Sequence, residues 1–368
     1  MSALTSSFDT AGLDTTGRRS GDHVRRQVFV CGDLHNLGDL KLLLQNLALT
    51  DGRGGIVRRW APLPVQVERQ VAEAGGELVS GRALLGFAYK AFRSQIVLGG
   101  GQLVRDNVSV LALVGLLLAV VSARLGGGGL VTRGLGVSII RSPLRRVLWR
   151  AILAQCPLVN LRDEGSGRNL VRLLPGKAQA CHADMVFLPT VGVHAITPGR
   201  GLRRWIVVAP CADASEGRSI EGAALDAVVA EALHRLPNAG LAIACHDPRA
   251  NMDNAVAARL VARWPDREIV VLDGYDLARL VELYREAALV VTNRLHALIF
   301  AILADAPALA VEDGTAKVRV VADHFAVPVV LQEDRTAVAT CLEAALGFDR
   351  VLRARTRQDL AQKAARNL

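Results

Sequence analysis

The sequence predicts an α/β protein with two Rossmann-like, doubly wound domains that face a central cleft. Its 368 residues, of which 51% are hydrophobic, suffice for two separate cores. In both halves, short apolar runs alternate with segments of helical length, which is typical of parallel sheets covered by helices on both faces. The alternation stops once, at 194–204, where proline and glycine stand among basic residues in the manner of an interdomain connection.

The elements follow one another regularly in each half. In the first half we expect strands at 27–32, 94–101, 130–137 and beginning at 156, with helices at 39–49, 145–155 and from 167 onward. In the second half we expect strands at 205–210, 241–247, 268–274, 288–293 and 307–313, with helices at 223–236, 254–264, 277–287 and up to 304. Two such domains place the loops at the carboxyl ends of their strands across one cleft, an arrangement close to that of the two-domain GT-B glycosyltransferases.

The domain boundaries follow from these patterns. Residues 1–26 mix Ser, Thr, Gly, Asp and Arg without the apolar stretch of a signal peptide, so we expect a disordered N-terminal extension. Residues 27–193 form the first domain, 194–204 the linker and 205–368 the second domain, whose last helix is free to pack back on the first.

Arginine far outnumbers lysine among the basic residues. The formal net charge is +9, and of the 44 basic residues five are lysines and 39 are arginines. Because guanidinium groups bind phosphate and carboxylate in a planar fork, this bias suits anionic ligands or an anionic membrane face, although genomic composition explains it equally well. The chain has no long basic block and only 4% aromatic residues, so the sequence predicts no nucleic-acid partner.

Cysteine usage and hydropathy bear on the compartment. The six cysteines form no Cys-x-x-Cys pair, and several end apolar runs, where a free cysteine behaves as a small hydrophobe. This favours a reducing compartment, and we expect a cytoplasmic protein. The most apolar segment, 108–123, falls short of the roughly 20 residues that a membrane-spanning helix needs, so we expect a buried helix there.

The segment 289–305, LVVTNRLHALIFAILAD, carries the clearest site signal. It reads as a strand followed by a helix that is apolar on every face, and such a helix is buried. Its first turn nevertheless contains Arg294 and His296, which together with the free N–H groups of a helix N-terminus make an anion site. Arg294 alone is explained equally well by a carboxylate partner, and His296 alone by a core position with its hydrogen bonds formed. Both together at the mouth of a cleft indicate function.

A second polar cluster follows the first strand, in VFVCGDLHNLGDLKLLL at 28–44. Gly32 and Gly38 allow a tight turn and close backbone approach, but the segment has neither a Walker loop nor the spacing of a dinucleotide-binding loop. Asp39 reads best as a residue of the helix N-terminus. Asp33 and His35 are the better candidates for chemistry.

Taken in their order along the chain, these segments and several others resemble motifs of the polysaccharide pyruvyl transferase family. The resemblance lies in Gly-Asp-x-x-Asn-x-Gly-Asp at 32–39 and Arg-Leu-His at 294–296. It continues in LGGGQLVRD (98–106), RGLGVSI (133–139), LRDEGS (161–166), HADMVFLP (182–189) and DGTAKV (313–318), which resemble the family's glycine-rich loops, Arg-Asp-Glu-x-Ser segment, aspartate segment and late lysine. Leu34 and His35 depart from the pattern, since we expect small or polar residues there.

The resemblance implies that phosphoenolpyruvate is the donor and that no metal or cofactor is needed. It implies as acceptor a sugar of a bacterial exopolysaccharide or of its lipid-linked precursor, on the side of the first domain, with phosphoenolpyruvate in the second. A lipid-linked acceptor would bring the protein into peripheral contact with the inner membrane.

The chemistry of ketal formation assigns roles to the matched residues. His296 would be the general acid, and Asp33 or His35 the base for the sugar hydroxyl. Arg294 and Arg162 would bind phosphate and carboxylate, with Lys317 as a weaker third cation. The substrate-binding set is completed by Leu295, Asn36, Gly100 and Gly101.

Two other functions are compatible with the sequence. A glycosyltransferase of the same architecture would bind a nucleotide sugar, for which Glu312 could serve as the ribose ligand. A non-catalytic polysaccharide assembly subunit could also keep the fold, although an inactive protein has little reason to bury the charges of the Arg-Leu-His turn.

Overall fold

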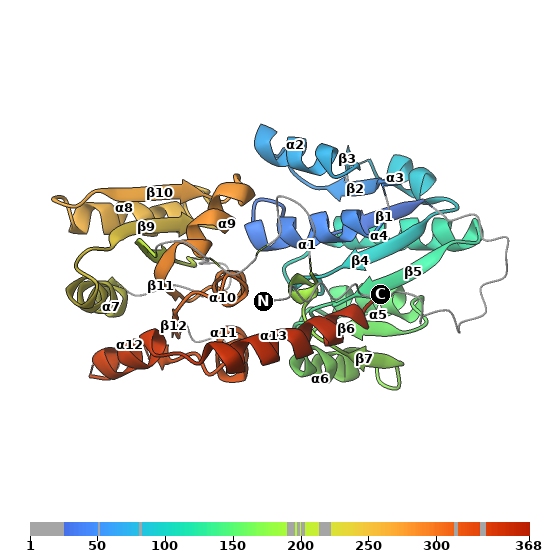
Figure 1. The fold of residues 1–368 in the computed structure, drawn as a ribbon. Helices are drawn as coiled ribbons and strands as arrows, with labels where there is room; N and C mark the ends of the chain where they lie inside the picture. The colour runs from blue at the N-terminus through green and yellow to red at the C-terminus, as the bar shows by residue number, and fades with distance from the viewer. Residues whose placement is uncertain are drawn as a thin grey trace, which may run out of the picture.

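The computed structural model describes residues 26–50, 52–80, 83–189, 196, 199, 203–212, 222–312, 316–331 and 336–368. The predicted N-terminal extension, apart from Arg26, and most of the predicted linker lie outside these residues. Figure 1 shows two α/β halves side by side, the first in blue to green and the second in yellow to red.

The first half is built on a parallel five-stranded sheet in the order β3-β2-β1-β4-β5. Its elements are β1 (Gln27–Val30), α1 (Leu37–Ala48), β2 (Gly55–Arg59), α2 (Val65–Glu73), β3 (Gly76–Ser80), α3 (Leu84–Ala91), β4 (Gln95–Gly99), α4 (Val110–Leu125), β5 (Gly129–Arg133) and α5 (Pro143–Ala154). A two-stranded parallel sheet follows, formed by β6 (Val159–Leu161) and β7 (Gln179–Cys181), with α6 (Glu164–Leu173) between them and the short 3-10 helix η1 (Met185–Phe187) after them.

The second half is built on a parallel six-stranded sheet in the order β10-β9-β8-β11-β12-β13. Its strands are β8 (Trp205–Ala209), β9 (Gly240–Cys245), β10 (Ile269–Asp273), β11 (Ala287–Thr292), β12 (Ala308–Val311) and β13 (Val329–Val330). Its helices are α7 (Gly222–Arg235), α8 (Asp253–Arg263), α9 (Leu277–Arg285), α10 (Leu295–Leu303), α11 (Ala316–His324), α12 (Val338–Leu346) and α13 (Arg350–Ala365).

The predicted fold class is confirmed, because both main sheets are wholly parallel and are covered by helices as in Rossmann-like domains. In each sheet the strand order reverses between two neighbouring central strands, β1 and β4 in the first half and β8 and β11 in the second. Ligands of doubly wound proteins bind beyond the carboxyl ends of such strands. The loops after β1, β4 and β11 are the segments that carry Asp33, Gly100 and Arg294.

The two halves share one hydrophobic core. Buried residues of α1, α2 and η1 pack in the same cluster as buried residues of β8, α9 and α10. Phe187 of η1 stacks on Phe325, just after α11, with the ring centroids 5.8 Å apart. A second cluster fills the other face of the first sheet, under α3, α4 and α5, and a third lies within the second half.

The last helix, α13, leaves the second half and ends against the first (Figure 1). Asn367, just beyond it, donates from Nδ2 to the carbonyl of Ala183 at 2.8 Å and accepts at Oδ1 from the Gly134 N–H at 3.0 Å. The asparagine is buried, so these bonds satisfy backbone groups that water does not reach.

The apolar segment predicted as a buried helix forms α4, which Ser109 caps by accepting from the Ala112 N–H at 3.1 Å. Only one face of α4 is buried, against the second cluster. The opposite face exposes large apolar side chains, so the expectation of a buried helix is met on one face only. Among the described helices, none has the length and apolar character needed to cross a membrane.

Candidate functional site

Two helix N-termini meet where the halves join. Asn36 caps α1 by accepting from the Gly38 N–H at 3.0 Å, and Arg294 stands at the cap position of α10. The Leu37 N–H donates to the carbonyl of His246, just beyond β9, at 2.9 Å. The ring of His296 lies directly on Gly38, where a methyl group would overlap it. Glycine at position 38 is therefore required by the contact between the halves.

His296 faces a carboxylate of the first half. Its ring is buried, and Nε2 lies 3.9 Å from Oδ2 of Asp184. The same oxygen is 3.6 Å from Nη1 of Arg162, while the other oxygen of Asp184 caps η1 by accepting from the Val186 N–H at 3.0 Å. Asp184 thus brings together an imidazole of the second half and a guanidinium of the first.

Arg162, predicted to bind substrate, follows β6 and is itself buried. Its Nε donates to Asp163 at 3.0 Å, and its Nη2 donates to Oε1 of Gln102 at 2.5 Å. Gln102 belongs to the loop after β4 that also contains Gly100 and Gly101. These bonds hold the arginine in one position beside Asp184, which is the rigidity that a binding residue needs.

Asp39 lies among glycines of two loops. Its carboxylate accepts from the Asp33 N–H at 3.0 Å and would lie 2.6 Å from a side-chain carbon at Gly101. Burial raises the pKa of Asp39 to about 6, although Arg105 and Arg162 act in the opposite direction. The sequence interpretation of Asp39 as a first-turn residue of α1 is correct but incomplete, since its carboxylate also faces the site loops.

Arg294 turns into its own half. Its Nε donates to the carbonyl of Pro210 at 3.2 Å, and its Nη2 donates to the carboxylate of Asp253. Burial alone would lower the pKa of Arg294, but the ion pair with Asp253 raises it above its ordinary value. This is the paired-arginine interpretation that the sequence left open. The pairing fixes the first turn of α10 and so the position of His296.

Asp33 and His35, predicted as catalytic, both contact the second half. Asp33 forms an ion pair with Nη2 of Arg249 at 2.8 Å and accepts from the His35 N–H at 3.1 Å. The ring of His35 lies 3.4 Å from the hydroxyl of Tyr275 through Nδ1 and 3.2 Å from the carbonyl of Pro62 through Nε2. A carbonyl only accepts, so Nε2 carries the proton in that bond.

The remaining predicted residues occupy three places. Gly100 and Gly101 directly follow β4 with φ values of 72° and 70°, a conformation that favours glycine, and the Gly100 N–H donates to the Arg133 carbonyl at 2.7 Å. Leu295 is the first residue of α10 and is partly exposed. Lys317 lies on α11, and its side chain is outside the described residues.

Sequence reasoning missed several residues of the junction. Arg249 and His246 follow β9 in the run Cys-His-Asp-Pro-Arg, and polar residues directly after a buried strand are the signal that had singled out Asp33. His246 is fully buried with Nε2 2.7 Å from the Tyr284 hydroxyl. Burial, with contributions from Arg294 and His296, lowers the pKa of His246 well below its ordinary value. His246 is therefore a neutral, structural histidine.

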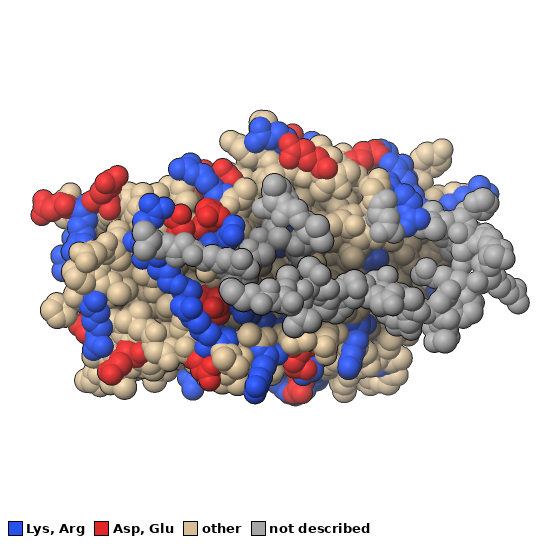
Figure 2. All heavy atoms as spheres, viewed as in Figure 1, with Lys and Arg blue, Asp and Glu red and all other residues tan. Residues whose placement is uncertain are grey.

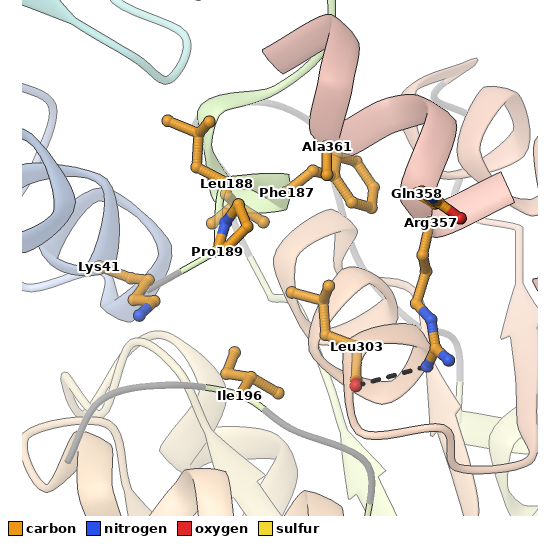
Figure 3. Close-up of a pocket in the computed structure, with 10 residues that line it drawn as sticks. Lys41, Phe187, Leu188, Pro189, Ile196, Leu303, Arg357, Gln358 and Ala361 are labelled. Atoms are coloured by element: carbon orange, nitrogen blue, oxygen red, sulfur yellow. Dashed lines mark hydrogen bonds between the residues drawn. The ribbon is translucent and has the colours of Figure 1, made fainter. Parts of the chain in front are cut away.

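A separate cavity of about 340 Å³ lies between α1, η1, α10 and α13 (Figure 3). Lys41, Leu303 and Arg357 line it together with mainly apolar side chains of residues 186–189. Arg357 donates from Nη1 to the Leu303 carbonyl at 3.5 Å, and burial lowers the pKa of Lys41 to about 8. The cavity contains none of the predicted site residues, so it is distinct from the His296 junction.

Two further features are the charged side chains on the surface and the side chains that could bind a metal ion. On the face in Figure 2, basic and acidic side chains lie beside one another in both halves. Over the part of the chain that the structure describes, no group of three or more His, Cys, Asp or Glu side chains could hold a metal ion.

The fold is of GT-B type, with two Rossmann-like halves. Similar solved structures include Anabaena Alr3699/HepE in complex with UDP and glucose, with 12% identity, a TM-score of 0.57 and coverage of 94% of this chain and 96% of that chain. A putative UDP-N-acetylglucosamine 2-epimerase from Listeria monocytogenes has 12% identity and a TM-score of 0.60, over 93% and 94% of the two chains. UDP-GlcNAc 2-epimerase from Neisseria meningitidis has 11% identity and a TM-score of 0.58, over 92% and 96%. At these identities the likeness shows the fold alone.

The family is defined by sequence. The model of the polysaccharide pyruvyl transferase family matches residues 78–314, and the chain belongs to this family. A search of curated proteins finds no match. The resemblance seen in the motifs is thus confirmed.

The contact between Gly38 and His296 predicts an unusual glycine effect. Alanine is favoured over glycine within a helix by about 1 kcal/mol, but at position 38 its methyl group would overlap the His296 ring. We expect Gly38→Ala to lower the free energy of unfolding by about 1–3 kcal/mol in chemical denaturation.

The matched control is Gly86→Ala in α3, where the nearest atom to an added methyl is 3.8 Å away and stability should be unchanged or raised. The double variant Gly38→Ala/His296→Ala should recover most of the loss, because the overlapping ring is removed. Equal stability of Gly38→Ala and Gly86→Ala would contradict the contact.

The raised pKa of Asp39 predicts a pH dependence of stability. The folded state holds the Asp39 proton up to about pH 6, whereas the unfolded chain releases it near its ordinary pKa of 3.8. The folded state thus binds more protons between these values, so its stability contribution is present below pH 3.8 and is lost as pH rises through 6. Asp39→Asn should therefore gain stability relative to the wild type over this window, by about 1–3 kcal/mol at pH 7 compared with pH 4. Urea unfolding of both proteins from pH 4 to 8 measures the difference, and parallel curves would contradict the assignment.

Proposed function

We propose that the protein forms a pyruvate ketal on a sugar of a bacterial exopolysaccharide or its lipid-linked precursor, with phosphoenolpyruvate as donor and phosphate as leaving group. The observation that carries this proposal is the meeting of His296 and Arg162, from opposite halves, at Asp184. In a member of the polysaccharide pyruvyl transferase family, this junction offers an acid and a cation at the place where doubly wound folds bind ligands.

The reaction begins at the methylene carbon of phosphoenolpyruvate. His296 gives a proton to this carbon, and the adjacent carbon becomes a cation that a sugar hydroxyl attacks, losing its own proton to a base. The C–O bond to phosphate then breaks, and a second sugar hydroxyl closes the ketal while releasing its proton. One phosphoenolpyruvate and two hydroxyls thus give one ketal and one phosphate.

The residues at the junction suit these steps. Nε2 of His296 lies 3.9 Å from Oδ2 of Asp184, and Nη1 of Arg162 lies 3.6 Å from the same oxygen, so the proposed acid and a cation for the donor meet at one carboxylate. Arg162 and the N-termini of α1 and α10 provide N–H groups and positive potential for the phosphate and carboxylate of the donor. Arg294 acts through its ion pair with Asp253, by positioning the turn that carries His296.

We place the general base, which takes the proton of the sugar hydroxyl, in the loop after β1. Asp33 is partly exposed and is held by Arg249, whereas both nitrogens of His35 have neighbours in Tyr275 and Pro62. Asp33 is therefore the better of the two predicted bases.

A nucleotide-sugar transferase is the second candidate, because the similar Anabaena structure was solved with UDP and glucose. The two functions differ in donor, and a ligand that binds the folded state raises its melting temperature. We expect phosphoenolpyruvate, but not UDP-glucose, to raise the melting temperature and to release phosphate when a sugar acceptor is present. A shift with UDP-glucose alone would support the glycosyltransferase, and no turnover with either donor would support an assembly subunit.

His296→Gln tests the acid directly. Glutamine fills similar space and donates a hydrogen bond, but it cannot supply a proton near neutral pH. We expect the variant to keep its fold and much of its donor-induced thermal shift while phosphate release falls by about 10²–10⁴-fold. In heavy water, the wild type should place deuterium in the ketal methyl group.

The control is His234→Gln, an exposed histidine on α7, which should leave turnover unchanged. If His296 were only structural, the melting temperature would fall and activity would follow the folded fraction. A folded His296→Gln protein with normal turnover would remove His296 from the mechanism.

A further inference from the structure

The outer face of α4 carries a continuous apolar stripe. Leu111, Leu118, Val121 and Leu125 are 56%, 41%, 43% and 79% exposed, and their spacing places them along one side of the helix. A helix on the surface of a monomeric protein ordinarily shows polar residues at these positions. An exposed apolar stripe of this length marks an interaction surface.

The neighbouring helices extend the apolar surface. Ser122 of α4 donates to the Ala88 carbonyl of α3 at 2.7 Å, so these two helices lie side by side. Leu85 and Tyr89 on α3 are 81% and 82% exposed. On the other side, Leu144 and Val147 on α5 are 54% and 60% exposed. We name this combined surface of α3, α4 and α5 the outer helical face.

The charges on the outer helical face have one sign. Asp106 is the single acidic residue between positions 83 and 162, and its carboxylate accepts from the Ser142 N–H at 3.1 Å. Basic side chains are frequent in the same segment, and the exposed ones include Arg93, Arg124, Arg141, Arg146 and Arg150, whereas Lys90 is paired with Glu77 of β3. Apolar side chains among cations match the headgroup region of an anionic bilayer. A second copy of this face would instead bring like charges together.

The outer helical face adjoins the proposed site. The helix α4 starts directly after the loop that holds Gly100, Gly101 and Gln102, and Gln102 binds Arg162. The start of α5 is tied to the same loop by the bond from Ser142 to Asp106. The starts of α4 and α5 on this face therefore lie next to the loop that contacts Arg162.

We propose that the outer helical face binds an anionic lipid bilayer, with the α4 stripe inserted among the headgroups, and thereby presents a lipid-linked sugar acceptor to the junction. This deepens the proposed function and rests on it for the nature of the acceptor. The binding itself is independent of catalysis, so the two can fail separately.

The experiment uses the full chain and vesicles of phosphatidylcholine with or without phosphatidylglycerol. Co-sedimentation should show binding to the anionic vesicles, with weaker binding as salt rises. Leu118→Gln/Leu125→Gln and Arg124→Gln/Arg141→Gln should each reduce the partition coefficient at least about tenfold. The control Val351→Gln/Leu352→Gln changes apolar residues of α13 that are 62% and 48% exposed and lie outside the face, so it should bind as the wild type does.

Circular dichroism and phosphate release with a water-soluble sugar acceptor show whether each variant is folded and active. Lost vesicle binding with unchanged release supports the proposal. Equal binding by all variants, or no binding by the wild type, overturns it without affecting the proposed reaction. A dimer that light scattering detects and that the α4 variants abolish would overturn it in favour of a second copy.

Discussion

The packing of His296 against Gly38 is the contact on which the site depends. It joins the first turn of α10 to the first turn of α1, and the bond from Leu37 N–H to the His246 carbonyl reinforces it. Neither half alone contains the site, because His296 comes from one and Asp184 from the other. The shared core beneath these helices explains how a weakly polar contact can fix the histidine, since movement of either helix would expose apolar area. The same contacts therefore determine both the stability of the paired halves and the geometry of the site.

Charged side chains surround this contact, some buried and others partly exposed, and three sets of them form ion pairs. Arg294 is paired with Asp253, Arg162 with Asp163 and Asp184, and Asp33 with Arg249. Replacing buried ion pairs by apolar residues is often neutral or stabilising, so a purely structural account leaves their number at one junction unexplained. The donor that we propose carries two anionic groups, a phosphate and a carboxylate, and its binding and protonation would use fixed charges of both signs. Arg294 can therefore be paired with Asp253 and still contribute to the proposed function, because the pair orients the helix that carries His296.

The sequence predicted the elements well where apolar runs were buried on both sides, as in β1, β4, β8 and β11. It assigned nothing between 50 and 93, where β2 is buried but includes two arginines in its five residues, and β3 is only partly buried. Within the site, it identified the polar loops because they follow buried strands, but not the partners of each side chain. Arg294 and His296 are two residues apart and point to different halves, and Asp253 lies 41 positions away from Arg294. Spacing along one helix turn cannot reveal which of two neighbours meets a distant carboxylate.

The helix α4 shows the same limit in another form. Its composition predicted burial, and the structure buries only the face that the first sheet can cover. Hydropathy predicts that a segment is shielded from water, but it does not identify the surface that shields it. In α10 that surface is protein on every side, and the charged first turn is the exception that indicates chemistry. In α4 protein covers one side alone, and the surrounding charges are almost wholly basic. An uncovered apolar stripe lies among cations and next to the loop that contacts Arg162, and this combination is the basis of our proposal that an anionic interface covers α4 and that the acceptor approaches from it.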